Sequence, residues 1–85
     1  MVLAGRIIKK GTVMAEARLS QETGTASFGE VLEVLLLKVC RELDISVPIW
    51  LGINTKDLAI KRRTSFYPDQ FIDKIKFDRF EIILE

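Results

Sequence analysis

Residues 27–43, SFGEVLEVLLLKVCREL, form the stretch around which the rest of this chain is organised. At about 100° per residue, its apolar side chains fall on one wide stripe, which is typical of a helix that lies on a core. The stripe consists of Phe28, Leu32, Leu35, Leu36, Val39 and Leu43, with Val31 and Cys40 on its borders. Ser27 and Glu30 have the spacing of a capping box, so the helix is expected to begin there.

The opposite face of this helix carries two apolar residues among charged ones. Val34 and Leu37 lie beside Lys38 and Arg41. Single exposed apolar side chains are common and need no function. A small apolar patch rimmed by charge is also typical of a surface that contacts a second copy of the chain or a partner helix. These four residues are therefore the candidate protein interface.

Length, composition and charge indicate one small globular domain over residues 1–85. Apolar residues make up 48% and charged residues 29% of the chain, which is far from the composition of a disordered segment. The 13 Lys and Arg against 12 Asp and Glu leave a formal charge of +1. No overall field therefore attracts the protein to nucleic acid or to an anionic membrane, and any such attraction must be local.

The cysteine count and the N-terminus indicate a soluble, cytoplasmic protein. The single Cys40 cannot form an internal disulfide, which fits a reducing compartment. The apolar start at residues 1–4 is too short for a signal peptide. Charged side chains inside the 27–43 helix would be costly in hydrocarbon, so no membrane association is expected.

Residues 2–20 have the alternation of a β-hairpin around Lys10-Gly11. A two-residue loop there would place Arg6 opposite Ala15 on the core face. A three-residue loop over residues 9–11, with the glycine left-handed, avoids this and is preferred. It groups Leu3, Gly5 and Ile7 with Val13, Ala15 and Ala17. The small residues in this set would leave a shallow trough in the sheet for the helix.

The remaining half of the chain is expected to supply the rest of the sheet. Alternation predicts a strand over residues 48–53 with Pro48 at its start and Trp50 on its outer face, and a weaker strand over 58–62 after a turn at 54–57. Residues 67–72 have the pattern of a single helical turn with Pro68 at its first position. Residues 77–84 alternate again and form the last predicted strand.

These elements predict an α+β domain in which a β-hairpin is followed by one amphipathic helix packed on a mixed four- to five-stranded sheet. The order, ββαβ(β)β, resembles that of a ubiquitin-like β-grasp. The chain ends at Leu84-Glu85 without a glycine tail, so nothing indicates a conjugated modifier. A different order of four strands, or a small half-open barrel, also fits the pattern.

No catalytic or cofactor-binding pattern is present, so the chain is expected not to be an enzyme. It contains no histidine, the commonest general base. Cys40 lies near the negative end of its helix, which does not activate a thiol. Residues 24–30, GTASFGE, have the glycine spacing of a phosphate loop but lack its lysine and hydroxyl. No cofactor, metal or small-molecule ligand is inferred.

A local basic segment offers a different function. Lys61, Arg62 and Arg63 are consecutive, and Trp50 and Tyr67 are near in sequence. Basic groups bind phosphates and aromatic rings stack on bases, so these five residues are the candidate contacts for single-stranded nucleic acid. The basic residues are explained more simply if the arginines lie along the sheet or pair with the aspartates that follow, Asp69, Asp73 and Asp78.

The pattern favours a small non-enzymatic protein-interaction module that self-associates or docks on a larger partner. A nucleic-acid-binding module that uses residues 61–63 is the alternative. The sequence alone determines neither function.

Overall fold

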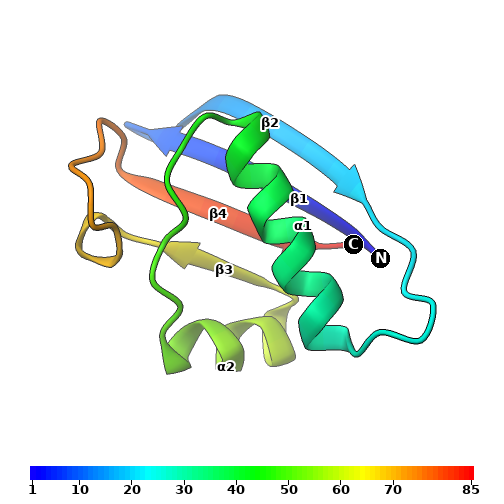
Figure 1. Ribbon diagram of the computed structural model, residues 1–85. Coiled ribbons are helices and arrows are strands. Elements are labelled where there is room, and N and C mark those ends of the chain that lie inside the picture. Colours follow the sequence, from blue (N-terminus) through cyan, green and yellow to red (C-terminus); the bar gives the residue numbers. More distant parts are fainter.

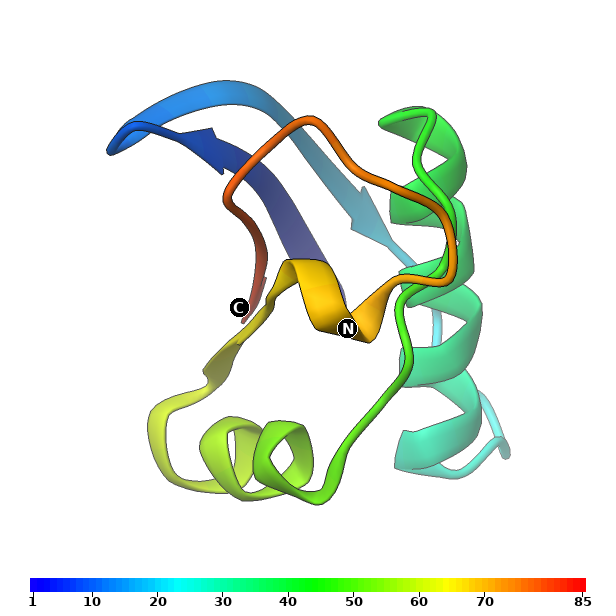
Figure 2. The ribbon, with the colours of Figure 1, turned by 90° about the vertical axis from the view of Figure 1, so that its left-hand side faces the viewer.

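Four strands and two α-helices make up the computed structural model, which describes residues 1–85 (Figure 1). The elements are β1 (Val2–Lys9), β2 (Thr12–Ser20), α1 (Phe28–Glu42), α2 (Gly52–Lys61), β3 (Arg63–Phe66), the short 3-10 helix η1 (Pro68–Gln70) and β4 (Arg79–Leu84). The strands form one sheet in the order β2-β1-β4-β3. Figure 2 shows α1 as a layer beside the sheet and α2 at one end of the molecule.

Helix α1 confirms the prediction for residues 27–43. Ser27 is its N-cap, and the Ser27 hydroxyl accepts a hydrogen bond from the Glu30 backbone N–H at 3.2 Å. The Glu30 carboxylate accepts from the Ser27 hydroxyl at 2.9 Å. Leu35 and Val39 on the predicted stripe are fully buried. Phe28, by contrast, is 55% exposed at the first position of the helix.

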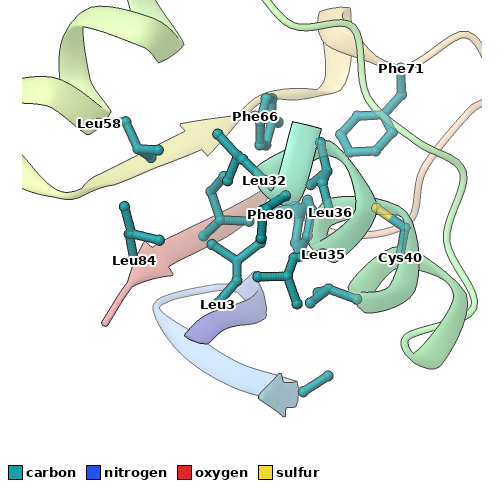
Figure 3. Close-up of a cluster of buried hydrophobic side chains, with 14 residues drawn as sticks. Leu3, Leu32, Leu35, Leu36, Cys40, Leu58, Phe66, Phe71, Phe80 and Leu84 are labelled. Atoms are coloured by element: carbon teal, nitrogen blue, oxygen red, sulfur yellow. The ribbon is translucent and has the colours of Figure 1, made fainter. Parts of the chain in front are cut away.

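The core lies between α1 and the sheet (Figure 3). Leu3, Phe66, Phe80 and Ile82 from the sheet are completely buried in it. The predicted trough is present at Gly5, where an added Cβ would overlap with Val39 of α1 and lie 2.9 Å from the Phe80 ring. The small side chain therefore sets how closely α1 approaches β1.

The hairpin turn differs from the prediction. The loop has two residues, Lys10 and Gly11, and both adopt positive φ angles of 52° and 75°. Two such residues fit the right-handed twist of the strands, which favours this turn over the predicted three-residue loop. The three-residue loop is therefore wrong, although the glycine is left-handed as expected.

A bulge in β2 explains why the two-residue loop does not place a charge in the core. Ile7 lies opposite Ala15, as predicted, whereas Ile8 lies opposite Val13, so the register shifts by one residue at Met14. Because of the shift, the part of β2 before the bulge turns its side chains to the face of the sheet opposite to the predicted one. Val13 is consequently 48% exposed on the helix-free face, and its predicted place on the core face is wrong.

The predicted strands over residues 48–53 and 58–62 are also wrong. Residues 45–51 form an extended linker without strand pairing, and α2 follows. The alternating Ile49, Leu51 and Ile53 do not share a buried face, since they are 46%, 44% and 53% exposed. The edge strand β3 begins only at Arg63.

All strand pairs are antiparallel, so the predicted mixed sheet is wrong. The order ββαα followed by two strands replaces the expected ββαβ(β)β, and with it the β-grasp-like order. The α+β class, the initial hairpin, the helix on a four-stranded sheet, the turn at Pro68 and the last strand are confirmed. Neither helix has the length and apolar character needed to cross a membrane.

Candidate functional site

A groove runs between α1 and α2, and we call it the α1–α2 groove. Its volume is about 670 Å³, within the range of ligand-binding clefts. Most of its lining is apolar and comes from four segments of the chain. These residues are Phe28, Leu32, Leu36 and Leu37 of α1, Val47, Pro48 and Trp50 of the linker, Leu58 and Ala59 of α2, and Leu84 of β4.

The linker wall of the groove is held in place by Trp50. Its ring packs on Phe66 with centroids 5.6 Å apart, and its indole N–H donates to the Thr55 hydroxyl at 2.8 Å. The backbone N–H of Ile49 donates to the Gln70 carbonyl at 2.6 Å. Trp50 is half-buried and lines the groove, so the side chain that was expected to face outward from a strand forms part of a wall.

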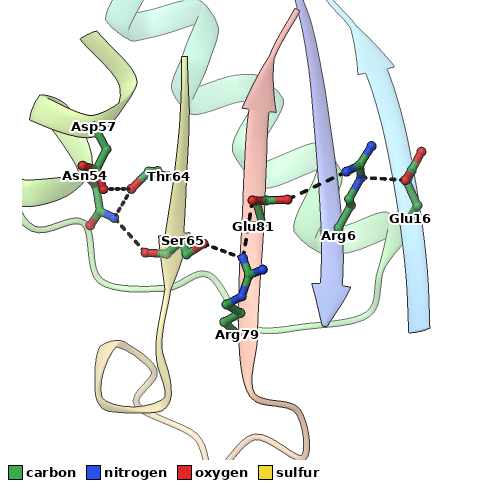
Figure 4. A network of polar contacts seen from close by, with 8 residues as sticks. All are labelled: Arg6, Glu16, Asn54, Asp57, Thr64, Ser65, Arg79 and Glu81. Carbon is green, nitrogen blue, oxygen red and sulfur yellow. Dashed lines mark hydrogen bonds and ion pairs between the residues drawn. The ribbon is translucent and has the colours of Figure 1, made fainter. Parts of the chain in front are cut away.

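The α2 wall is anchored by Asn54, whose side chain is completely buried (Figure 4). Its Nδ2 donates to the Thr64 hydroxyl at 2.8 Å and to the Ser65 carbonyl at 3.1 Å. Its Oδ1 accepts from the Leu51 N–H at 2.9 Å and from Gln70 Nε2 at 3.0 Å. All four hydrogen-bonding positions of the amide are used, which fixes α2 against β3 and η1.

The rim of the groove exposes apolar side chains to solvent. Phe28, Leu37 and Val47 are 55%, 43% and 44% exposed. Two charged residues stand on opposite walls, Glu33 on α1 and Arg62 at the end of α2. Neither forms an ion pair within the chain. The groove therefore offers an apolar floor with one free charge of each sign.

The structure places the predicted interface residues on the outer face of α1 but divides them. Val34 and Leu37 are 40% and 43% exposed, and Lys38 and Arg41 are exposed beside them. Only Leu37 lines the groove. Lys38 donates through Nζ to the Gln21 side chain at 2.6 Å on the opposite flank of the helix.

The structure does not bring the candidate nucleic-acid contacts together. Arg62 and Trp50 line the α1–α2 groove, whereas Lys61, Arg63 and Tyr67 line a smaller cleft of about 220 Å³ beside β3. Asp57 and Glu81 share that cleft, and Lys61 lies 3.9 Å from the Asp57 carboxylate. In this cleft the negative charges of Asp57 and Glu81 therefore offset the positive charges of Lys61 and Arg63.

Cys40 is 1% exposed, and burial raises the pKa of its thiol to about 11. A thiol that stays protonated at neutral pH is a poor nucleophile. No group of three His, Cys, Asp or Glu side chains lies close enough to hold a metal ion.

Comparison of the chain with protein-family models, with curated proteins and with solved structures found no match.

Sequence reasoning identified Leu37 and Trp50 but missed the groove that unites them. The groove depends on α2, which the alternation of residues 49–53 concealed. Asn54 gave one local signal, because a side chain at the third position of a helix can accept a hydrogen bond from the backbone N–H of the residue before the helix, here Leu51.

Proposed function

We propose that this chain is a small non-enzymatic protein-interaction module whose α1–α2 groove binds an amphipathic helical segment of a partner protein. The observation that carries the proposal is the apolar floor of the groove, continuous with exposed Phe28, Leu37 and Val47 at its rim. Two helices that diverge over an apolar floor offer a place for a third, and helix-in-groove binding buries such a floor with few polar contacts.

The charges on the two walls define the chemistry of the partner helix. Glu33 on the α1 wall fits a basic side chain, and Arg62 on the α2 wall fits an acidic one. Both are free of internal partners, so pairing with a ligand breaks no existing ion pair. The preferred segment is therefore a helix with an apolar face flanked by a basic residue on one side and an acidic residue on the other.

Trp50 is the only tryptophan in the chain and lines the groove, so its fluorescence reports binding there. The probe is a synthetic amphipathic helix with leucines on one face, a lysine on one flank and a glutamate on the other. We expect a saturable blue shift of Trp50 emission. We also expect weaker binding when the two flanking charges of the peptide are both made acidic, because Glu33 then repels the peptide.

Two substitutions on α1 form a matched pair for this test. Leu37→Lys places a charge in the groove rim, whereas Val34→Lys changes a side chain of similar exposure that does not line the groove. We expect the first variant to weaken peptide binding about tenfold or more and the second to leave it unchanged. Equal effects of both variants, or no binding of the wild type, would contradict the groove as the docking surface.

Nucleic-acid binding stays a prediction for the cleft that contains Lys61, Arg63 and Tyr67, since these three residues do share one surface. It requires binding of single-stranded RNA that weakens steeply with salt. Loss of that binding in Lys61→Gln and Arg63→Gln variants, with Arg62→Gln unaffected, would assign it to the cleft.

A further inference from the structure

Strand β2 is an edge of the sheet, and its outer side has no strand neighbour (Figure 1). It is nine residues long and contains neither proline nor lysine, and the bulge at Met14, which also discourages pairing, interrupts only its first part. Residues 15–19 lie beyond the bulge and pair regularly with β1. The outer N–H and C=O groups of this segment are therefore a template for another strand.

The helix-free face of the sheet carries a row of alternating charges that ends at this edge (Figure 4). Arg6 on β1 lies directly opposite Glu81 on β4 and Glu16 on β2. The Arg6 guanidinium is 2.8 Å from the Glu16 carboxylate and 3.9 Å from that of Glu81. From β4 to β2 the charges of the row are therefore negative (Glu81), positive (Arg6) and negative (Glu16). Glu16 lies on the edge strand, so a positive side chain from a neighbouring strand would continue the alternation.

We infer that β2 pairs with β2 of a second copy, antiparallel and centred on Ala17. In this register Glu16 faces Arg18 of the second copy, and Arg18 faces the other Glu16. The charge row then continues across the interface from Glu81 through Arg6 and Glu16 to the Arg18 of the second copy. Centring on Glu16 or on Arg18 would instead place like charges opposite each other, which is unfavourable.

The same register also brings apolar side chains of the two copies together on the helix side of the joined sheets. Directly opposite residues of an antiparallel pair share a face, so Ala17 meets Ala17 and Ala15 meets Leu19 on the helix side. Both copies of α1 then lie on one face of a continuous eight-stranded sheet, and the small Ala17 side chains leave space where the copies meet. The inference does not depend on the proposed function, because α2 packs beside β3 at the other edge and the groove stays open.

Charge exchange tests this register directly. Arg18→Glu places glutamates opposite each other twice in the dimer, and Glu16→Arg places arginines opposite each other twice. We expect each variant alone to dimerise about tenfold or more weakly than the wild type, since two-fold symmetry doubles each cross-strand effect. A mixture of the two variants restores opposite charges at both positions, so it is expected to form a heterodimer as tight as the wild-type dimer.

Sedimentation equilibrium over a range of concentrations measures these masses, and circular dichroism verifies that each variant is folded. Glu85→Gln is the matched control: it removes the partner with which Arg18 pairs inside its own chain and leaves the edge intact. We expect normal dimerisation of this variant and of Val34→Glu. A monomeric wild type, a mixture that stays monomeric, or a dimer that only Val34→Glu disrupts would overturn the inference.

Discussion

Gly5 is a point of close approach between β1 and α1, because a Cβ there would overlap with Val39. We predict that Gly5→Ala lowers the free energy of unfolding by about 1–3 kcal/mol, the usual cost of overpacking a core. Gly29→Ala is the control, since no atom lies within 4 Å of its added Cβ. That variant is expected to be unchanged or up to about 1 kcal/mol more stable, because alanine favours the helix. Urea denaturation of both variants measures the difference, and equal stability would contradict the close approach.

Cys40 links burial to a pH dependence. Burial raises the pKa of the thiol from 9.0 to about 11, so between these values the unfolded chain loses a proton that the folded chain keeps. Deprotonation therefore favours unfolding, and this contribution to stability is lost as pH rises from about 9 to about 11. Cys40→Ala should show a shallower fall in stability over this range when both proteins are denatured with urea. Rapid labelling of the wild-type thiol by a disulfide reagent near pH 8 without unfolding would contradict its burial.

Helix α2 depends on polar contacts more than on its apolar face, since Leu58 is its one buried apolar residue. We predict that Asn54→Ala lowers the free energy of unfolding by about 2–4 kcal/mol, because it removes four hydrogen bonds at once, two of them to the buried side chains of Thr64 and Gln70. Thr55→Ala removes a single exposed hydrogen bond to Trp50 and should cost less than about 1 kcal/mol. Denaturation monitored by Trp50 emission compares them, and similar losses would show that the Asn54 network does not anchor α2.

The two helices show what local sequence can and cannot predict. For α1, periodicity, capping and burial agree, so its bounds were predicted to within a residue of Phe28–Glu42. For α2, Ile53 and Ile60 are exposed and the buried residue at its start is a polar Asn54. Its formation depends on partners ten and sixteen residues away in sequence, Thr64 and Gln70. A hydrophobic period in the sequence carries no information about such contacts. The α2 wall of the groove was therefore missed together with the helix.

The hairpin illustrates the same limit at a smaller distance. Lys10-Gly11 correctly marked the turn, and the exclusion of Arg6 from the core correctly grouped Ile7 with Ala15. The bulge at Met14 reconciles these two facts, but nothing in the alternation of β2 distinguishes it from a longer loop. The sequence thus predicted which residues of the hairpin face the core, but not the β-bulge that brings them there.

At the scale of the whole molecule, the fold presents two separate surfaces. The sheet order places β2 at one edge and β3, with α2 beside it, at the other. The α1–α2 groove and the β2 edge can therefore be occupied at once, and a dimer through β2 would carry two grooves.

Binding of a partner helix in the α1–α2 groove is tested most directly by amide chemical-shift mapping with NMR. Titration of the isotope-labelled chain with the amphipathic peptide should shift the amide signals of residues 28–37, 47, 49, 50 and 58–62, while those of β2 and the helix-free face do not shift. Shifts confined to the outer face of α1, to β2 or to the cleft beside β3, or no shifts at all, would contradict binding in the groove.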